Sequence, residues 1–230
     1  MIEFFRFPHT PHLAWLGGRQ PRDDKVLSTA DVQELLRGEV VIEEKVDGAN
    51  VGFSLDARGN VRAQNRGSYL EPNACHPQFK PLFRWLEPRA SALREALRPG
   101  LMLFGEWCWA VHSVRYLSLP DWFLAFDVLD RMRNEFWSTE RRDALAFDLG
   151  LATTPQLTRG HYDVPGLISL LGQSRLGTEP MEGLYVRHDE AGRLIARAKL
   201  VRAEFTQAIE KHWTRRRLEM NQRADGASWH

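Results

Sequence analysis

The sequence contains very little cysteine: Cys75 and Cys108 are the only two in 230 residues. Two cysteines cannot build a framework of disulfides, and a reducing setting is the simplest expectation. No apolar run reaches the length of about 18 residues that a membrane-spanning helix needs. Residues 1–6 also lack the basic start and long apolar core of a signal peptide. We therefore expect a cytoplasmic protein that does not enter a membrane.

The chain also has almost no net charge. Lys and Arg number 31 against 30 Asp and Glu, so the total charge of +1 neither favours nor excludes nucleic acid. The distribution is uneven, because residues 187–217 hold nine Lys and Arg against four Asp and Glu, a local excess of +5. A basic segment of this kind indicates an anionic partner. We see no repeat, low-complexity segment or linker, and we expect residues 1–230 to form a single domain with a large core.

The most informative stretch is Glu44-Lys45-Val46-Asp47-Gly48-Ala49-Asn50. It lies between two apolar runs, 40–42 and 51–55, that both predict β-strands. A lysine at the end of a strand, beside carboxylates, suggests a cationic nucleophile that faces a cleft. The alternative is an exposed lysine before an ordinary Asp-Gly hairpin turn. This stretch alone leaves both interpretations open.

Further candidates lie at or within other predicted strands. An arginine follows strand 61–64, and its planar fork suits two phosphate oxygens, although a single loop arginine is usually only solvated. One glutamate follows the apolar run 101–104, and another precedes the strand that starts at 183. A phenylalanine lies within strand 122–129, where it could also be ordinary core. Two cations alternate in strand 194–201 and therefore point the same way. These residues are Arg66, Glu106, Glu182, Phe126, Arg197 and Lys199.

Helices are predicted between these strands. Ser28 or Thr29 caps a short helix that ends at Gly38, and Pro88 divides residues 77–98 into two helical pieces. Ser138 or Thr139 caps a further helix that ends at Gly150, and another helix is predicted within 160–177. A final helix, from about residue 202, carries Lys211 and Arg215 to Arg217, and we expect it to bind a polynucleotide. His9 with His12, and Cys108 with His112, lack the further ligands that a zinc site requires.

The ordered combination of these motifs resembles the covalent nucleotidyltransferase superfamily, which includes ATP-dependent ligases and RNA capping enzymes. Within it the chain is most similar to the RNA ligase family, especially the branch like the second class of phage RNA ligases. The residues that carry this likeness are Glu44-Lys45-x-Asp47-Gly48-x-Asn50. The resemblance extends from Pro8 to about Trp213. It implies an α+β nucleotidyltransferase fold with antiparallel sheets around a nucleotide cleft, helices outside, and no OB-fold domain.

The resemblance implies two catalytic residues. Lys45 resembles the nucleophile that attacks the α-phosphate of ATP and becomes lysyl-AMP, and Lys199 resembles the cation that neutralises this phosphate. Glu182 resembles the carboxylate that holds Mg²⁺ or Mn²⁺. Arg197, a further candidate for contact with the nucleotide phosphates, stands where many relatives have a second lysine, and it keeps the charge without the compact ammonium group.

Five more residues match positions that hold the nucleotide in the family. Glu44 and Asn50 resemble residues that brace the nucleotide and the strand end, while Arg66 resembles the arginine that contacts phosphate and sugar. Glu106 resembles the carboxylate that binds the ribose hydroxyls, and Phe126 would stack on adenine.

The implied substrates are ATP and a nicked or broken RNA strand, alone or in an RNA/DNA hybrid. AMP passes from the lysine to a 5′-phosphate, and a 3′-hydroxyl then displaces it. One alternative is a GTP-dependent capping-type nucleotidyltransferase, for which we would expect a following OB-fold domain; only about seventeen residues follow Trp213. The other is a non-catalytic nucleic-acid-binding protein, which leaves Lys45, Glu106 and Glu182 unexplained.

Overall fold

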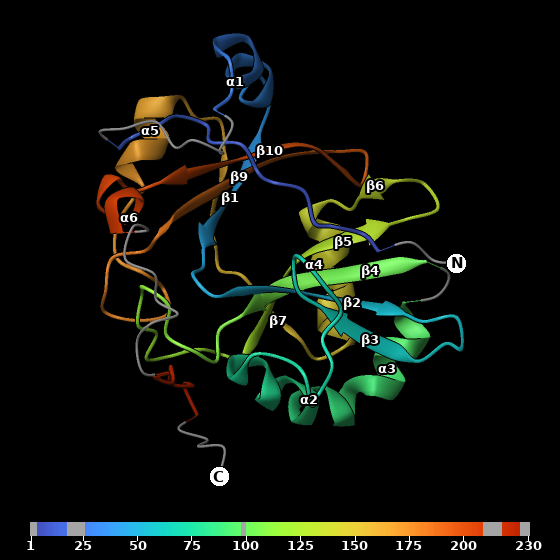
Figure 1. Ribbon diagram of the computed structural model, residues 1–230. Helices are drawn as coiled ribbons and strands as arrows, with labels where there is room; N and C mark the ends of the chain where they lie inside the picture. Colours follow the sequence, from blue (N-terminus) through green and yellow to red (C-terminus); the bar gives the residue numbers. More distant parts are fainter. Residues whose placement is uncertain (1–3, 18–25, 98–99, 209–217, 226–230) are drawn as a thin grey trace.

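Two β-sheets form the centre of the protein (Figure 1). A computed structural model describes residues 4–17, 26–97, 100–208 and 218–225. The four-stranded sheet has the order β10-β9-β1-β8 and is antiparallel throughout. Its strands are β1 (Val40–Lys45), β8 (Gln156–Gly160), β9 (Gly183–Glu190) and β10 (Arg193–Val201).

The second sheet has the order β3-β2-β4-β5-β6, and the short β7 adds to β5 in parallel. Its strands are β2 (Ala49–Leu55), β3 (Val61–Gln64), β4 (Leu101–Trp107), β5 (Phe123–Asp130), β6 (Glu135–Phe136) and β7 (Ala152–Thr153). The predicted α+β class with antiparallel sheets is confirmed.

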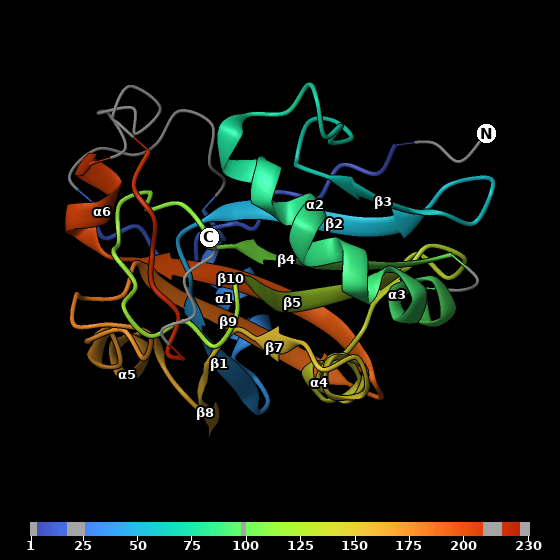
Figure 2. The same cartoon turned by 90° about the horizontal axis from the view of Figure 1, so that it is seen from below.

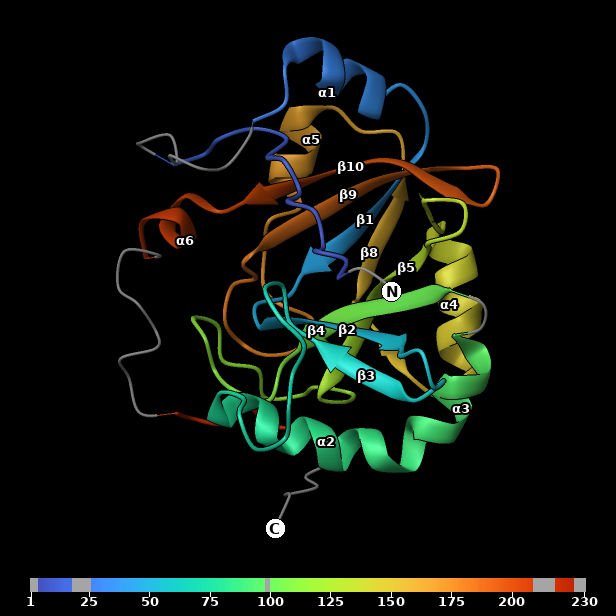
Figure 3. The ribbon, with the colours of Figure 1, turned by 45° about the vertical axis from the view of Figure 1, so that its right-hand side comes forward.

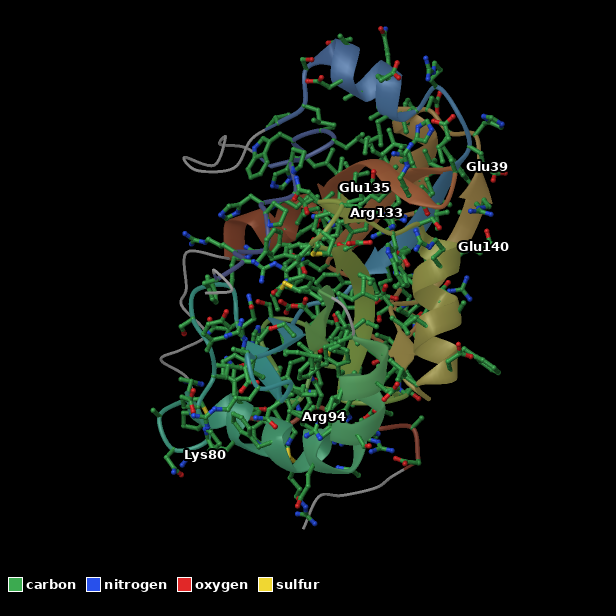
Figure 4. All side chains as sticks on the ribbon, turned by 90° about the vertical axis from the view of Figure 1, so that its right-hand side faces the viewer. Glu39, Lys80, Arg94, Arg133, Glu135 and Glu140 are labelled. Carbon is green, nitrogen blue, oxygen red and sulfur yellow. The ribbon has the colours of Figure 1, made fainter. Side chains whose placement is uncertain are left out.

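Helices cover the outer faces of both sheets. Figures 2 and 3 show α2 (Lys80–Leu86) and α3 (Ala90–Ala96) along the outside of the six-stranded sheet. Lys80 and Arg94 on these helices are exposed at the surface (Figure 4). The other sheet is covered by α1 (Thr29–Leu35) and α5 (Val164–Ser169), and α4 (Thr139–Asp148) lies beside β5.

The helix boundaries follow the predicted capping residues. Ser28 forms a capping box with Asp31 at α1, and Ser138 accepts a hydrogen bond from the backbone N–H of Arg141 at α4. Pro88 lies in the short 3₁₀ turn η2 (Glu87–Arg89) that separates α2 from α3, as predicted; another, η1 (Pro77–Phe79), precedes α2. The predicted last helix begins as α6 (Ala203–Ala208). Lys211 and Arg215 to Arg217 lie outside the described residues.

Three apolar clusters follow from the alternation of strand side chains. The largest lies between the six-stranded sheet and α2, where Trp85 stacks on Phe53 with ring centroids 5.8 Å apart. A second lies between the four-stranded sheet and its helices, around Ile42 and Leu184. A third, which includes Phe104 and Phe126, occupies the opposite face of β4 and β5. Both faces of the six-stranded sheet are therefore packed in its centre.

The stretch after Lys45 is not a hairpin turn. Strand β1 pairs with β8 and β9, whereas the next strand, β2, pairs with β3 and β4 in the other sheet. The hairpin alternative is therefore wrong, and the Asp-Gly sequence connects the two sheets. Within the described parts of the chain, no helix combines the length and apolar character needed to cross a bilayer.

Candidate active site

A cavity of about 620 Å³ opens where the two sheets meet. Its lining comes from β1 and β9–β10 on one side and from β2, β4 and β5 on the other. Seven of the nine candidate residues line it: Lys45, Asn50, Arg66, Glu106, Phe126, Glu182 and Lys199. The structure thus brings together side chains that are up to 154 positions apart in the sequence (199 − 45).

Lys45 is the last residue of β1 and lies opposite Gly183 of β9. Its Nζ donates a hydrogen bond to Glu182 Oε2 at 2.6 Å, and both side chains are largely buried. Burial by itself lowers the pKa of Lys45, but the attraction of Glu182, Tyr185 and Glu106 outweighs it and raises the pKa above its ordinary value. In this state the lysine holds its proton.

The two carboxylates next to the lysine have raised pKa values. Burial raises the pKa of Glu106 to about 8 and that of Glu182 to about 7, although Lys45 opposes both shifts. Glu106 Oε1 accepts a hydrogen bond from the backbone N–H of Gly48 at 3.1 Å. Gly48 must be glycine here, because a Cβ would lie 2.7 Å from the carbonyl oxygen of Trp107. The connection between β1 and β2 (residues 46–48), which we call the lysine loop, is therefore packed directly against β4.

The Glu106→Gln substitution should raise the melting temperature relative to the wild type, and this difference should grow as the pH rises. The folded protein keeps a proton on Glu106 up to about pH 8, whereas the unfolded chain loses it near the ordinary pKa of 4.5. A raised carboxyl pKa thus contributes stability that is present at low pH and is lost as the pH rises through this window. The loss is at most about 1.4 kcal/mol for each pH unit. Glutamine cannot ionise, and its amide oxygen can still accept the bond from Gly48.

Melting temperatures between pH 5 and pH 8.5 check this expectation. The difference between Glu106→Gln and the wild type should be small at pH 5 and should grow toward pH 8. Glu95→Gln, an exposed acid on α3, is the matched control and should give a constant difference. A constant difference for Glu106→Gln as well would contradict the raised pKa.

Asp47 tethers the lysine loop to the segment after β4. Its Oδ2 accepts hydrogen bonds from the backbone N–H groups of Ser113 (2.6 Å) and Val114 (2.9 Å). Its own N–H donates to the hydroxyl of the buried Tyr116 at 2.7 Å. The aspartate of the motif therefore has a clear role in holding the loop that follows Lys45.

Three of the cavity-lining side chains carry a phenyl or phenol ring: Phe79, Phe126 and Tyr185. Phe126 on β5 has one side in the third apolar cluster, where Phe7 lies edge-on at 5.4 Å. Tyr185 on β9 lies opposite Lys199 of β10, and its ring centroid is 6.0 Å from Lys45 Nζ. Tyr185 was not among the site residues predicted from the sequence. The signal that could have found it is its position: Tyr185 lies on the strand that follows the candidate carboxylate Glu182, two residues after Gly183.

Glu44 and Arg197 do not line the cavity. Glu44 lies on the other side of β1 from Lys45, is fully buried, and accepts hydrogen bonds from Ser174 Oγ (2.5 Å) and Arg175 N–H (2.8 Å). Burial raises its pKa, although these two bonds oppose the shift. Arg197 pairs with Asp127. This geometry gives no support to the predicted nucleotide contacts of either side chain.

A buried ionic network lies behind Phe126. Arg142 of α4 donates to Glu43 at 2.7 Å and to the Phe126 carbonyl at 2.9 Å. Arg187 of β9 donates to Asp127 at 2.8 Å and to the same carbonyl at 3.2 Å. These bonds tie β1, β5, β9 and α4 together beneath the cavity. This network was not predicted from the sequence, because nothing in the local patterns indicates which charges are buried together.

The described residues contain no group of three or more His, Cys, Asp or Glu side chains placed to hold a metal ion by themselves. Mg²⁺ does not need such a cage, since it keeps several waters and uses one or two carboxylates together with substrate phosphates. Glu182, a cavity-lining carboxylate next to the lysine, fits this requirement.

Known structures share this fold. Naegleria gruberi RNA ligase with PPi is 18% identical, with a TM-score of 0.58, over 81% of this chain and 55% of that chain. A variant of the same ligase with ATP and Mn is 16% identical, with a TM-score of 0.58 and the same coverage. Another variant, with AMP and Mn, is 17% identical, with a TM-score of 0.59, over 92% of this chain and 65% of that chain. The fold is therefore that of an RNA ligase nucleotidyltransferase region, and the chain spans little more than half the length of the first of these structures.

The sequence profile of the family described as RNA ligase matches residues 38–201. The chain belongs to the RNA ligase family. The matched region lies within the predicted span of Pro8 to about Trp213 and is shorter. No curated protein matches the chain. The narrower likeness to the second class of phage RNA ligases is not tested by these matches.

Proposed function

We propose that this chain is an ATP-dependent RNA ligase that carries AMP on Lys45. The observation that carries the proposal is the position of this lysine: it ends a strand inside the cavity, bonded to Glu182 and close to the carboxyl group of Glu106. Membership of the RNA ligase family supports the reaction class. The Naegleria ligase structures with ATP and Mn and with AMP and Mn support the choice of nucleotide and metal.

In the proposed first step, Lys45 Nζ attacks the α-phosphorus of ATP. A nitrogen–phosphorus bond forms, the bond to the bridging oxygen breaks, and pyrophosphate leaves. Lys199 and Arg66 line the same cavity and supply positive charge for the phosphate oxygens. Glu182 is the proposed ligand of Mg²⁺ or Mn²⁺, which would add positive charge at the phosphates when bound.

The lysine must lose its proton before it attacks. The ion pair with Glu182 opposes this loss, whereas burial favours it. Any contact that draws the Glu182 carboxylate away from Lys45 therefore lowers the pKa of the amine. We propose that the resting ion pair keeps the nucleophile protonated until nucleotide and metal occupy the cavity.

The base and ribose would be held by the remaining cavity residues. Phe126 and Tyr185 offer aromatic surfaces to adenine, Glu106 offers a carboxyl group to the ribose hydroxyls, and Asn50 braces the strand end beside them. Asn50 Oδ1 is buried without a hydrogen-bond partner among the described residues, which leaves an acceptor for the ligand. We do not extend this proposal to Glu44 or Arg197, whose side chains are engaged elsewhere.

The later steps transfer AMP to the 5′-phosphate of a broken strand and then join the ends. A 5′-phosphate oxygen attacks the AMP phosphorus, and Lys45 leaves and takes up a proton. The 3′-hydroxyl then attacks the 5′-phosphorus and releases AMP. We propose an RNA strand, alone or in an RNA/DNA hybrid, as the substrate, and the basic stretch from Arg202 onward as part of its binding surface.

We further propose one nucleotidyltransferase domain for residues 1–230, because both sheets contribute to a single cavity. The free cysteines Cys75 and Cys108 accord with the reducing, cytoplasmic setting that we propose for it.

Incubation with nucleotide labelled at the α-phosphate, followed by a denaturing gel, tests the proposal. ATP with Mg²⁺ should give a covalently labelled protein, and unlabelled RNA with a 5′-phosphate should then remove the label. A label from GTP instead would identify a capping-type enzyme. No label from either nucleotide would favour a non-catalytic nucleic-acid-binding protein.

Phe126→Leu should raise the ATP concentration needed for adduct formation by about tenfold, since stacking of a base on an aromatic ring contributes about 1–3 kcal/mol. Phe126→Ala should form still less adduct at a given ATP concentration. Because one side of Phe126 is core, both variants should also lose some stability. The measurement is adduct yield against ATP concentration, at a temperature where each variant is folded.

Phe104→Leu is the matched control, because Phe104 belongs to the same apolar cluster but does not line the cavity. It should lower the melting temperature and leave the ATP dependence as in the wild type. Equal ATP dependence in the Phe126 and Phe104 variants would mean that Phe126 is core only.

A further inference from the structure

We call residues 108–122, which join β4 to β5, the support loop. Residues 218–225 form a strap across this loop. The strap lies outside the region that the RNA ligase profile matches. Backbone hydrogen bonds join the two along their length: Val111 N–H donates to the Glu219 carbonyl, Asn221 N–H to Trp109, Leu119 N–H to Gln222, and Ala224 N–H to Leu119. The strap therefore packs on the loop as an additional layer.

Asn221 is the one buried residue of this strap. It is only 2% exposed, and its Oδ1 accepts a hydrogen bond from the backbone N–H of Tyr116 at 2.8 Å. Its Nδ2 donates to the carbonyls of Cys108 (2.8 Å) and Ala110 (3.2 Å). One buried amide thus connects the two arms of the support loop. Loss of this side chain would leave three buried backbone groups without these bonds.

The support loop in turn holds the lysine loop. Tyr116, whose N–H is bound by Asn221, accepts a hydrogen bond from the N–H of Asp47 through its hydroxyl. Ser113 and Val114, which lie between the two points held by Asn221, donate to the Asp47 carboxylate. Asp47 is two residues from Lys45. A continuous set of hydrogen bonds therefore runs from the strap to the nucleophile's own loop.

We propose that Asn221 is a positioning residue for Lys45, acting through the support loop and Asp47. The proposal rests on the proposed function of Lys45 as the AMP carrier. Asn221 does not line the cavity, so its loss removes no contact with the nucleotide. Loss of Asn221 loosens the loop that sets the direction of the Lys45 side chain. Displacement of a reacting group by about 1 Å can lower a rate about 10²-fold. The affinity for ATP stays as it is.

The test compares Asn221→Ala with the wild type at a temperature where both are folded. The rate of lysyl-AMP formation at saturating ATP should fall about 10- to 100-fold, while the ATP concentration for half-maximal rate should change less than twofold. Hydrogen exchange should speed up at the amides of Asp47, Ser113 and Val114 and remain as in the wild type in β9. Asn221→Ser, which keeps a small polar group, should show the same changes and replaces the alanine variant if that one does not fold.

Asp163→Ala is the matched control for lost stability. Asp163 caps α5, on the outer side of the other sheet, and its loss should lower the melting temperature without changing the adenylylation rate. An Asn221 variant with wild-type rate, or one with a reduced rate but unchanged exchange at Asp47, Ser113 and Val114, overturns the proposal. A wild-type protein that forms no adduct overturns the proposed function instead, and the exchange measurement then still reports whether the strap holds the loop.

Discussion

Lys45→Arg should form no covalent adduct with ATP and should melt close to the wild-type temperature. Arginine keeps the positive charge beside Glu182, so the buried pair and the fold persist. Its guanidinium does not lose a proton in proteins and cannot serve as the nucleophile. The measurement is label retained on a denaturing gel, together with a melting curve. An adduct in this variant at the wild-type level would show that another residue carries the nucleotide.

Lys45→Ala should also lose the adduct, and it should lose stability as well. Removal of one partner of a buried ion pair costs about 3–5 kcal/mol when the remaining charge cannot be neutralised. Glu182 and Glu106 can take up protons, since burial already raises their pKa values to about 7 and about 8 against the opposing effect of Lys45. Without the lysine these values rise further, so the folded state keeps protons that the unfolded chain has lost. The stability loss relative to the wild type should therefore be small at pH 5 and larger at pH 8.

Glu182→Gln should reduce lysyl-AMP formation by about 10²- to 10³-fold, the range found when one preorganised electrostatic contact to a transition state is removed. Glutamine can still accept the hydrogen bond from Lys45 Nζ, so the fold should persist. Two effects oppose each other. The neutral amide no longer raises the pKa of Lys45, which favours attack, but the proposed ligand of the divalent cation is lost. We expect the second effect to dominate.

Adduct formation against Mg²⁺ or Mn²⁺ concentration separates these effects. The Glu182→Gln variant should need more metal for the same yield. Glu190→Gln changes an exposed acid at the far end of β9, the strand that begins directly after Glu182; it is the control and should behave as the wild type. A variant that reacts faster than the wild type at neutral pH would mean that Glu182 serves only to hold the lysine protonated.

Much of the fold was predictable because strand and helix signals are local. The alternation from Leu194 to Val201, and the capping signals at residues 28–29 and 138–139, predicted elements that the structure contains. These signals depend on the periodicity of one strand or on one turn of a helix, which neighbouring residues determine. The same alternation placed Arg197 and Lys199 on one face of β10. The alternation could not predict that the two side chains have different neighbours.

The surroundings of Arg197 depend on residues far away in the sequence. Asp127 of β5 takes its charge, and the rings of Phe7 and Phe136 lie 4.6 and 4.5 Å from its guanidinium carbon. Lys199, two residues later, instead lines the cavity. The two-residue periodicity of a strand determines on which face each side chain lies. It contains no information about which other element packs against that side chain.

The sequence by itself determined the type of most elements, although not of the strands β6, β7 and β8, and the presence of a lysine nucleophile motif with its carboxylates, because these depend on residue types at short spacings. Only the tertiary structure decided that β1 and β2 belong to different sheets, that Glu44 faces away from the cavity, and that Asn221 braces the loop behind Asp47. Strand pairing and the burial of charge arise from contacts between segments that are distant in the sequence, such as Asn221 with Tyr116, 105 positions apart, or Arg142 with Glu43, 99 positions apart. The free energy of such contacts is set by desolvation and hydrogen bonding in the assembled core, which no local pattern encodes.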